Sequence, residues 1–264
     1  MNMLWIYDVP NWVSLLLVVG TTIGVGLIWL FGLRPWVSRL HEEKNHNEVV
    51  SYFWGAVVLF YGVMVGLIAV GVWEQFASTD EKVTLEASQL AALYRDVSAY
   101  PEPQRSRLQN DLRDYTRSVI YKSWPLQRKG IIPAETNEIL WRVQSDLLAV
   151  QPGTYGGLAL HSETLHAFNS LVELRRMRLH SVGSGLPAAV WVVVALGAAI
   201  TLSVACFFET VSFVTHLWMV VLTASLLGLI IWLLVVMDRP FLGEVSVGPE
   251  PFEQVYNSIM ASRH

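Results

Sequence analysis

The most concentrated positive charge in the chain is a group of three arginines, Arg175, Arg176 and Arg178. Guanidinium groups that stand this close together raise the local concentration of anions, and they also bind the acidic headgroups of a membrane surface. From Ser181 onward, 28 consecutive residues carry no Asp, Glu, Lys or Arg. The sequence therefore predicts that the arginines either attract small anions or anchor a helix end to lipid.

Seven histidines and one cysteine are the other side chains whose chemistry deserves consideration. His161 and His166 are five residues apart, and this spacing does not bring two imidazoles onto one helix face. Cys206 is the single cysteine, so an internal disulfide is excluded. The P-loop, zinc-protease, nucleophile-elbow and dithiol motifs are also missing. We therefore predict no catalytic residue, no metal site and no cofactor, and we expect that the protein is not an enzyme.

The elements that position these residues include long stretches without charge. Although 40 of the 264 residues are charged, four windows of 25 to 28 residues contain none. A bilayer core of about 30 Å is crossed by roughly 20 apolar residues in a helix, and continuous rather than alternating hydrophobicity disfavours barrel strands. The sequence therefore predicts an all-α polytopic membrane protein in a lipid bilayer. Its four transmembrane helices are expected at residues 9–33, 49–73, 183–208 and 210–237.

The segment between the second and third windows has the composition of a soluble domain. It carries 13 basic and 13 acidic residues, a balance that argues against nucleic-acid binding. Apolar residues recur at helical spacing over residues 81–100 and 104–122, in a stretch that begins near Pro133, and over 158–179. These helices form a four-helix bundle or extend the membrane helices. The predicted regions are a transmembrane hairpin (1–73), a helical soluble domain (74–180), a second hairpin (181–237) and a C-terminal tail (238–264).

Basic residues near the spans predict the orientation. With four spans, both termini and the central domain lie on the same side of the membrane. Five basic residues lie near span ends on that side and three on the other: Lys82, Arg175, Arg176, Arg178 and Arg239, against Arg34, Arg39 and Lys44. Basic residues near spans stay preferentially in the cytoplasm. We therefore predict that both termini and the central domain are cytoplasmic.

Three stretches, in order and spacing, resemble the bestrophin-like family of membrane proteins. They are Trp73-Glu74-Gln75-Phe76 followed by Glu86-Ala87; Tyr115 followed by Trp124-Pro125; and the arginine cluster followed by Asp238-Arg239-Pro240-Phe241-x-Gly243. The resemblance covers about residues 52–256. It departs from the family at Ser123, where members tend to have Glu.

The resemblance implies kinship with the true bestrophins, which are pentameric anion channels with four membrane helices and a helical cytosolic domain. It implies a homo-oligomer, a pentamer, that conducts small anions in the bacterial inner membrane. The run Pro240-Phe241-Leu242-Gly243-Glu244 is similar to a run that follows the fourth helix of the true bestrophins. In those proteins a string of aspartates comes next and binds calcium. Because Val245-Ser246-Val247 follows in this chain, the resemblance does not imply calcium gating.

In the true bestrophins the second membrane helix lines the pore, and Trp73-x-Gln75-Phe76 is similar to the aromatic end of that helix. Matching this motif places Gly55, Leu59 and Val63 at the narrow part of the pore. A register shifted by one residue places Ala56, Phe60 and Met64 there instead. A hydrophobic constriction gates by dewetting and still passes weakly hydrated anions. The alternative is that these residues pack against other helices or lipid.

Charged residues at the span ends have more than one interpretation. Glu74 either marks the membrane boundary or pairs with one of the three clustered arginines. Asp238 and Arg239 are interpreted as a helix terminus with a snorkelling arginine.

A second functional hypothesis is a membrane sensor or scaffold without channel activity. Its helical domain would bind a ligand or a partner protein, and this hypothesis favours the opposite orientation. The chain has no signalling output domain, so such a protein would need a partner.

Overall fold

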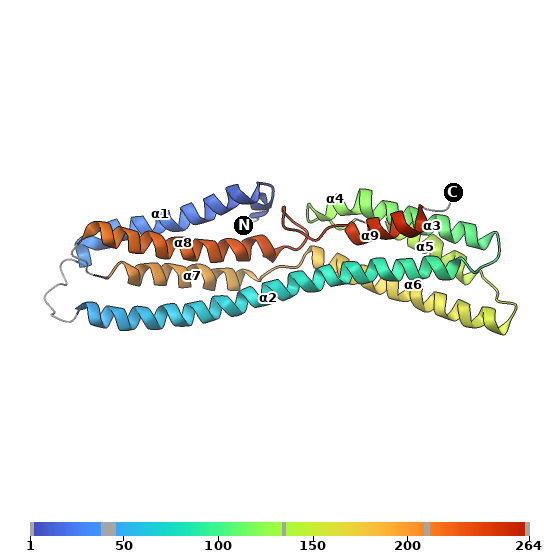
Figure 1. Ribbon diagram of the computed structural model, residues 1–264, viewed down its shortest axis with the longest axis horizontal. Helices are drawn as coiled ribbons and strands as arrows, with labels where there is room; N and C mark the ends of the chain where they lie inside the picture. Colours follow the sequence, from blue (N-terminus) through green and yellow to red (C-terminus); the bar gives the residue numbers. More distant parts are fainter. Residues whose placement is uncertain (1–2, 38–45, 134–135, 209–211, 262–264) are drawn as a thin grey trace. The chain divides into compact units, whose positions relative to one another are not determined.

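A computed structural model describes residues 3–37, 46–133, 136–208 and 212–261 (Figure 1). The regular structure in these ranges is helical throughout, which confirms the predicted all-α fold. The α-helices are α1 (Asn11–Val37), α2 (His46–Val97), α3 (Gln104–Ser118), α4 (Trp124–Gln127), α5 (Thr136–Leu148), α6 (Tyr155–Val182), α7 (Ala188–Ala205), α8 (Phe213–Asp238) and α9 (Glu250–Val255). A 3-10 helix, η1 (Met3–Tyr7), precedes α1, and two π-helical turns, η2 (Val119–Ser123) and η3 (Tyr256–Met260), follow α3 and α9.

Within these ranges, four helices are long and apolar enough to cross a membrane, as predicted. They are Asn11–Leu33, Asn47–Val97, Ala188–Ala205 and Phe213–Asp238. The predicted loop between the first two spans includes residues 38–45, and the predicted turn at Glu209 falls in 209–211. Both segments lie outside the described residues, so Arg39 and Lys44 are not placed.

The chain divides into two compact units, and α2 contributes to both. Unit 1 comprises residues 1–74 and 185–238, with α1, the first part of α2, α7 and α8. Unit 2 comprises residues 75–184 and 239–264, with the second part of α2, helices α3 to α6, and α9. The sequence analysis described residues 238–264 as a C-terminal tail. Residues 239–264 of this segment belong to unit 2.

Unit 1 is built around close packing of α1 along α8. A Cβ atom on Gly228 of α8 would lie 2.9 Å from the Cα atom of Val19 on α1, so the backbones approach too closely there for any side chain. At the start of α1, the Trp232 indole donates a hydrogen bond to the Ser14 hydroxyl, 3.0 Å away. In lipid, where the hydrophobic effect does not drive helices together, small residues let two helices approach closely enough for van der Waals packing to hold them.

The second transmembrane segment and the first soluble helix, which the sequence analysis separated at residue 73, are one helix of 52 residues. Figure 1 shows α2 as one uninterrupted ribbon. The physical reason is that residues 72–97 contain neither Pro nor Gly, the two residues that most readily break a helix. The helix ends at Val97, before Pro101 and Pro103.

Unit 2 encloses its own hydrophobic core, to which α2, α3, α5 and α6 contribute Leu90, Leu112, Val143 and Leu171, all 0% exposed. The C-terminal segment completes this core. The residues that it contributes to the core are Phe241, Val247, Phe252 and Met260. Their burial explains why residues after 238 belong to this unit rather than forming a detached tail.

Candidate functional site

The part of α2 in unit 1 has an apolar face that the described residues of this unit leave exposed. Leu59, Phe60 and Val63 are 64%, 76% and 57% exposed, and Gly55 is exposed beside them. Met64, from the shifted register, is half-buried against the unit. In a membrane-spanning helix, such an apolar face contacts lipid, another subunit or the wall of a pore.

The opposite face of α2 is turned toward α7. Tyr61, Val65 and Val72 are buried there. The Tyr61 hydroxyl donates a hydrogen bond to the carbonyl oxygen of Val194, 3.0 Å away. Because Tyr61 packs against α7, the face of α2 that carries Leu59 and Val63 points away from α7.

At the end of its unit 1 part, α2 carries the predicted motif residues Trp73 and Glu74. Trp73 is 60% exposed, and Glu74 is also exposed. An exposed tryptophan followed by a carboxylate is typical of a membrane boundary.

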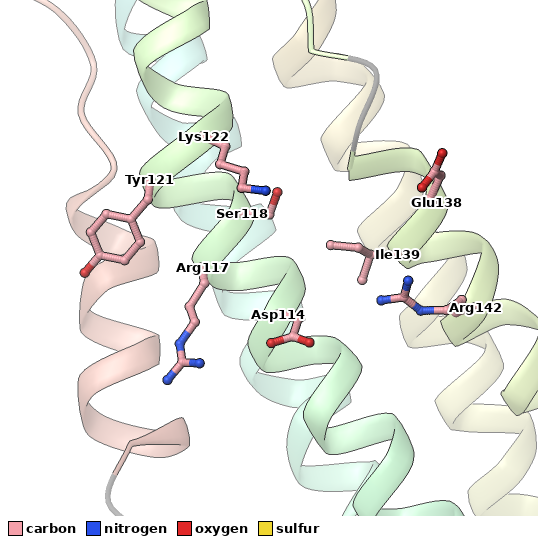
Figure 2. Close-up of a pocket in the computed structure, with 8 residues that line it drawn as sticks. All are labelled: Asp114, Arg117, Ser118, Tyr121, Lys122, Glu138, Ile139 and Arg142. Atoms are coloured by element: carbon pink, nitrogen blue, oxygen red, sulfur yellow. The ribbon is translucent and has the colours of Figure 1, made fainter.

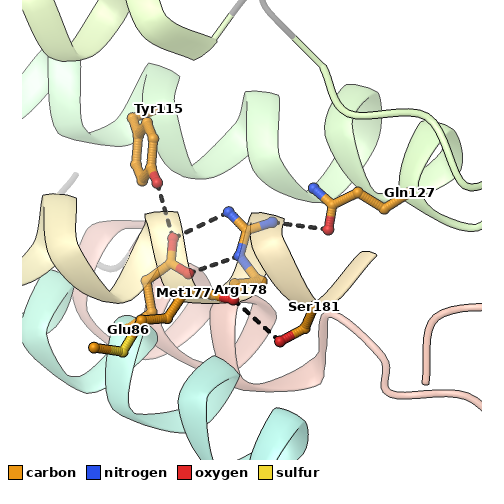
Figure 3. A network of polar contacts seen from close by, with 6 residues as sticks. All are labelled: Glu86, Tyr115, Gln127, Met177, Arg178 and Ser181. Carbon is orange, nitrogen blue, oxygen red and sulfur yellow. Dashed lines mark hydrogen bonds and ion pairs between the residues drawn. The ribbon is translucent and has the colours of Figure 1, made fainter. Parts of the chain in front are cut away.

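The arginine cluster does not act as one group. Arg178 is 1% exposed, and its guanidinium forms a bidentate ion pair with the carboxylate of Glu86 on α2 (Figure 3). The Nε–Oε2 distance is 2.6 Å and the Nη2–Oε1 distance is 3.0 Å. This arrangement differs from the expectation that Arg178 faces lipid or anions, because its charge is matched by a carboxylate inside unit 2. The sequence analysis considered Glu74 as a partner for one of the clustered arginines. The carboxylate that pairs with Arg178 is instead that of Glu86, twelve residues later on α2.

The other two arginines have different environments. Arg175 is 6% exposed, whereas Arg176 is exposed. Of the three, Arg176 is therefore the one whose charge faces outward from unit 2. A lipid or anion contact by the cluster would depend on Arg176.

Further polar and aromatic groups surround the ion pair. The Tyr115 hydroxyl donates to Glu86 Oε1 at 2.9 Å, and Arg178 Nη1 donates to Gln127 Oε1 at 2.8 Å (Figure 3). The Arg178 guanidinium also lies over the rings of Trp124 and Phe252, at 5.3 and 5.7 Å from their centroids. These contacts supply the hydrogen bonds that a buried charge pair requires.

The environment holds Arg178 and Tyr115 in their protonated forms. Burial alone would lower the pKa of Arg178, but the charge and hydrogen bonds of Glu86 outweigh burial and raise that pKa. Burial, with the adjacent Glu86 charge, raises the pKa of the Tyr115 hydroxyl well above its usual range. Arg178 therefore keeps its positive charge beside Glu86, and Tyr115 keeps the proton that it donates to this carboxylate.

The predicted motif after the fourth span forms a turn whose first two residues hydrogen-bond to the segment between α6 and α7. Asp238 Oδ1 accepts a hydrogen bond from the backbone N–H of Leu186 at 2.5 Å. Arg239 donates to the carbonyl oxygens of Gly183 and Ser184 at 2.9 and 3.1 Å. These bonds give Arg239 a partner in the protein, where the sequence analysis expected a snorkelling side chain.

The remaining residues of this motif build the same turn. Pro240 is buried, and its carbonyl oxygen accepts a hydrogen bond from the N–H of Val247 at 2.8 Å. Phe241 is 1% exposed and its ring packs edge-on against Trp124, with centroids 5.7 Å apart. Gly243 has a φ of +81°, a conformation that favours glycine.

Unit 2 also has a pocket of about 560 Å³, which residues of α3, η2 and α5 line. Figure 2 shows Lys122 and Arg142 extending from η2 and α5 toward the space between these helices. The carboxylates of Asp114 and Glu138 also line the pocket. It therefore offers charges of both signs to a small polar ligand.

Glu86 is the functional residue that sequence reasoning left without a role, although it is part of the matched motif. Its neighbours on one face of α2 are Val83 and Leu90, both 0% exposed. A lone carboxylate inside such an apolar stripe signals a buried charge that needs a partner. Leu85, an apolar residue one position before Glu86, lies outside this stripe and is 47% exposed.

These features define the class of protein: an all-helical polytopic membrane protein with four candidate membrane-spanning helices in the described residues. The sequence profile of the Bestrophin-like domain matches residues 20–252, and the chain therefore belongs to the Bestrophin-like domain family. No curated protein sequence matches the chain.

Solved structures show the same fold. A bacterial bestrophin homologue from Klebsiella pneumoniae superimposes with a TM-score of 0.67 at 11% identity, covering 94% of this chain and 99% of that chain. A mutant of a Klebsiella pneumoniae bestrophin homologue gives a TM-score of 0.64 at 12% identity, with coverages of 94% and 96%. A structure described only as a membrane protein gives 0.67 at 10% identity, with coverages of 94% and 99%.

Proposed function

We propose that this chain assembles into a homo-oligomeric ring, a pentamer, and forms a channel for small anions. The first part of α2 lines the pore, with Gly55, Leu59 and Val63 at its narrow part and Phe60 at the edge of this face. The observation that carries the proposal is the uncovered apolar face of α2. Membership of the Bestrophin-like family supports it, because the true bestrophins line their pore with the second membrane helix.

The exposures favour one register of the pore face over the other. Gly55, Leu59 and Val63 are all exposed. In the shifted register Ala56 and Phe60 are exposed as well, but Met64 is half-buried. Phe60 is exposed but stands next to Tyr61, which packs against α7. We therefore propose that the side chains of Leu59 and Val63 face the pore and that the side chain of Met64 is turned away from it.

The preference for anions follows from the chemistry of the proposed constriction. The face carries no charge, so a passing ion must shed part of its hydration shell without a compensating ligand. Chloride and larger halides lose water more readily than small cations do, and a hydrophobic constriction therefore selects for them. Arg176 is the exposed charge of the arginine cluster, and it would raise the local concentration of anions at the surface of unit 2.

The proposed setting is the bacterial inner membrane, with both termini and unit 2 in the cytoplasm. Basic residues near the span ends support this orientation. Reporter fusions at the C-terminus test it, because an enzyme active only in the cytoplasm should be active there.

Purified protein in liposomes tests the channel. Chloride efflux should exceed that of protein-free liposomes, and Leu59→Ala should raise the flux because it widens the constriction. Leu196→Ala is the matched control, since Leu196 is a similarly exposed leucine on α7. Flux equal to that of empty liposomes, from a preparation whose mass shows an intact oligomer, would overturn the proposal.

A ligand-binding role for unit 2 is the second candidate, and the pocket between η2 and α5 favours it. Such a sensor would show thermal stabilisation by a small polar ligand and no chloride flux. Removing charges on both walls, by Lys122→Gln with Arg142→Gln, should then abolish the stabilisation. A monomer or dimer in solution would favour this candidate over a central pore.

A further inference from the structure

Tyr61 inserts into a site on α7 that glycine alone leaves open. A Cβ atom on Gly197 would lie 2.4 Å from two carbons of the Tyr61 ring, closer than real contacts allow. The Tyr61 hydroxyl reaches past this glycine to the carbonyl oxygen of Val194, 3.0 Å away and nearly one turn earlier on α7. The side chain is 8% exposed. The contact therefore combines a close steric fit with a directional hydrogen bond.

This contact fixes the rotation of α2 about its own axis. An α-helix turns by about 100° per residue, so side chains two positions apart are about 160° apart around the helix. Leu59 and Val63 each stand two residues from Tyr61, and both are exposed while Tyr61 is buried. A rotation that brought Met64 outward would withdraw Tyr61 from Gly197 and break its bond to Val194. In lipid, no water is available to satisfy the freed hydroxyl.

We propose that Tyr61, docked on Gly197, is the positioning residue that turns Leu59 and Val63 toward the pore. This inference rests on the proposed channel function and adds the contact that sets the register of the pore face. It predicts that the conducting face depends on a residue that does not itself line the pore.

Cysteine accessibility in reconstituted full-length protein tests the proposal. The single native cysteine, Cys206, is buried, and Cys206→Ala provides the background. Leu59→Cys, Val63→Cys and Met64→Cys are then introduced singly, and a charged, membrane-impermeant thiol reagent is applied while chloride flux is measured. The reagent should inhibit flux through the first two variants and leave the third unaffected.

Adding Gly197→Ala should reverse this pattern, with loss of inhibition at positions 59 and 63 and new inhibition at position 64. Gly62→Ala is the matched control, because a Cβ atom there meets no atom within 4 Å, and it should leave the pattern unchanged. Tyr61→Phe keeps the ring and removes the hydrogen bond, so it should give a partial change even where Gly197→Ala prevents folding.

The outcomes separate this inference from the channel proposal. An identical pattern with Tyr61→Phe, Gly197→Ala and Gly62→Ala would overturn the positioning role and leave the channel intact. Absence of chloride flux in the Cys206→Ala background and in the unaltered protein would instead overturn the channel proposal.

Discussion

Glu86 and Arg178 form an ion pair in the interior of unit 2, with side chains that are 0% and 1% exposed. The pair joins α2 to α6, and Tyr115 and Gln127 bring α3 and α4 to the same point. Four helices of the unit therefore meet at one set of charge-assisted hydrogen bonds. Because removing one partner of a buried pair leaves the other charge uncompensated, the pair makes specific predictions about stability.

Glu86→Gln should destabilise the protein strongly. The substitution preserves the shape of the side chain but leaves the Arg178 guanidinium buried without its counter-charge, at a cost of about 3–5 kcal/mol. Thermal unfolding of the detergent-solubilised protein, followed by circular dichroism, measures the effect. Glu173→Gln on the exposed side of α6 is the control and should be nearly neutral. Equal unfolding temperatures for the two variants would contradict the importance of the pair.

Replacing both charged partners by apolar residues should be less harmful than replacing either one. The double variant Glu86→Leu, Arg178→Met removes both desolvated charges together and fills a similar volume. We expect its unfolding temperature to lie above that of either single variant. A double variant whose destabilisation equals the sum of the two single effects would show that the two charges act independently.

Because Tyr115 is buried, we expect its contribution to the free energy of unfolding to decline at alkaline pH. Burial and the Glu86 charge raise the folded-state pKa of Tyr115 above its ordinary value of 10.0. The unfolded state therefore loses this proton first, so the contribution of Tyr115 is fully present below about pH 10 and is lost as pH rises. Tyr115→Phe should lower stability at pH 8, and this difference should shrink above pH 10.

Unfolding temperatures measured from pH 8 to 11 check this expectation. Tyr121→Phe is the control, because Tyr121 is 70% exposed on the adjacent η2 turn. Its curve should run parallel to that of the unaltered protein. A Tyr115→Phe curve with the same shape as the control would refute the predicted linkage.

Gly228→Ala should weaken unit 1 through the contact of α8 with α1. The added methyl group would press against the backbone of Val19, and overpacking of this kind costs about 1–3 kcal/mol. Gly20→Ala on α1 meets no atom within 4 Å and should be neutral or slightly stabilising. Thermal unfolding of both variants in the same detergent measures the difference. A Gly228→Ala protein as stable as Gly20→Ala would contradict the close approach.

Sequence patterns predicted the spans well because each depends on local composition. The charge-free windows identify four membrane helices, and the two prolines Pro101 and Pro103 predict where α2 ends. Long-range pairing has no such local signal. Glu74 and Glu86 are both carboxylates on α2, and only packing of α6 against the helix selects Glu86 as the partner of Arg178.

The sequence by itself determined that this chain is an all-helical membrane protein of the Bestrophin-like family, because membrane spans require long uncharged runs and because its motifs keep their order. Only the tertiary structure decided which face of α2 is free and which arginine is exposed. Those properties depend on the contacts of Tyr61 with α7 and of Arg178 with Glu86. Each joins residues more than 90 positions apart, and the neighbouring sequence of either partner does not specify the other.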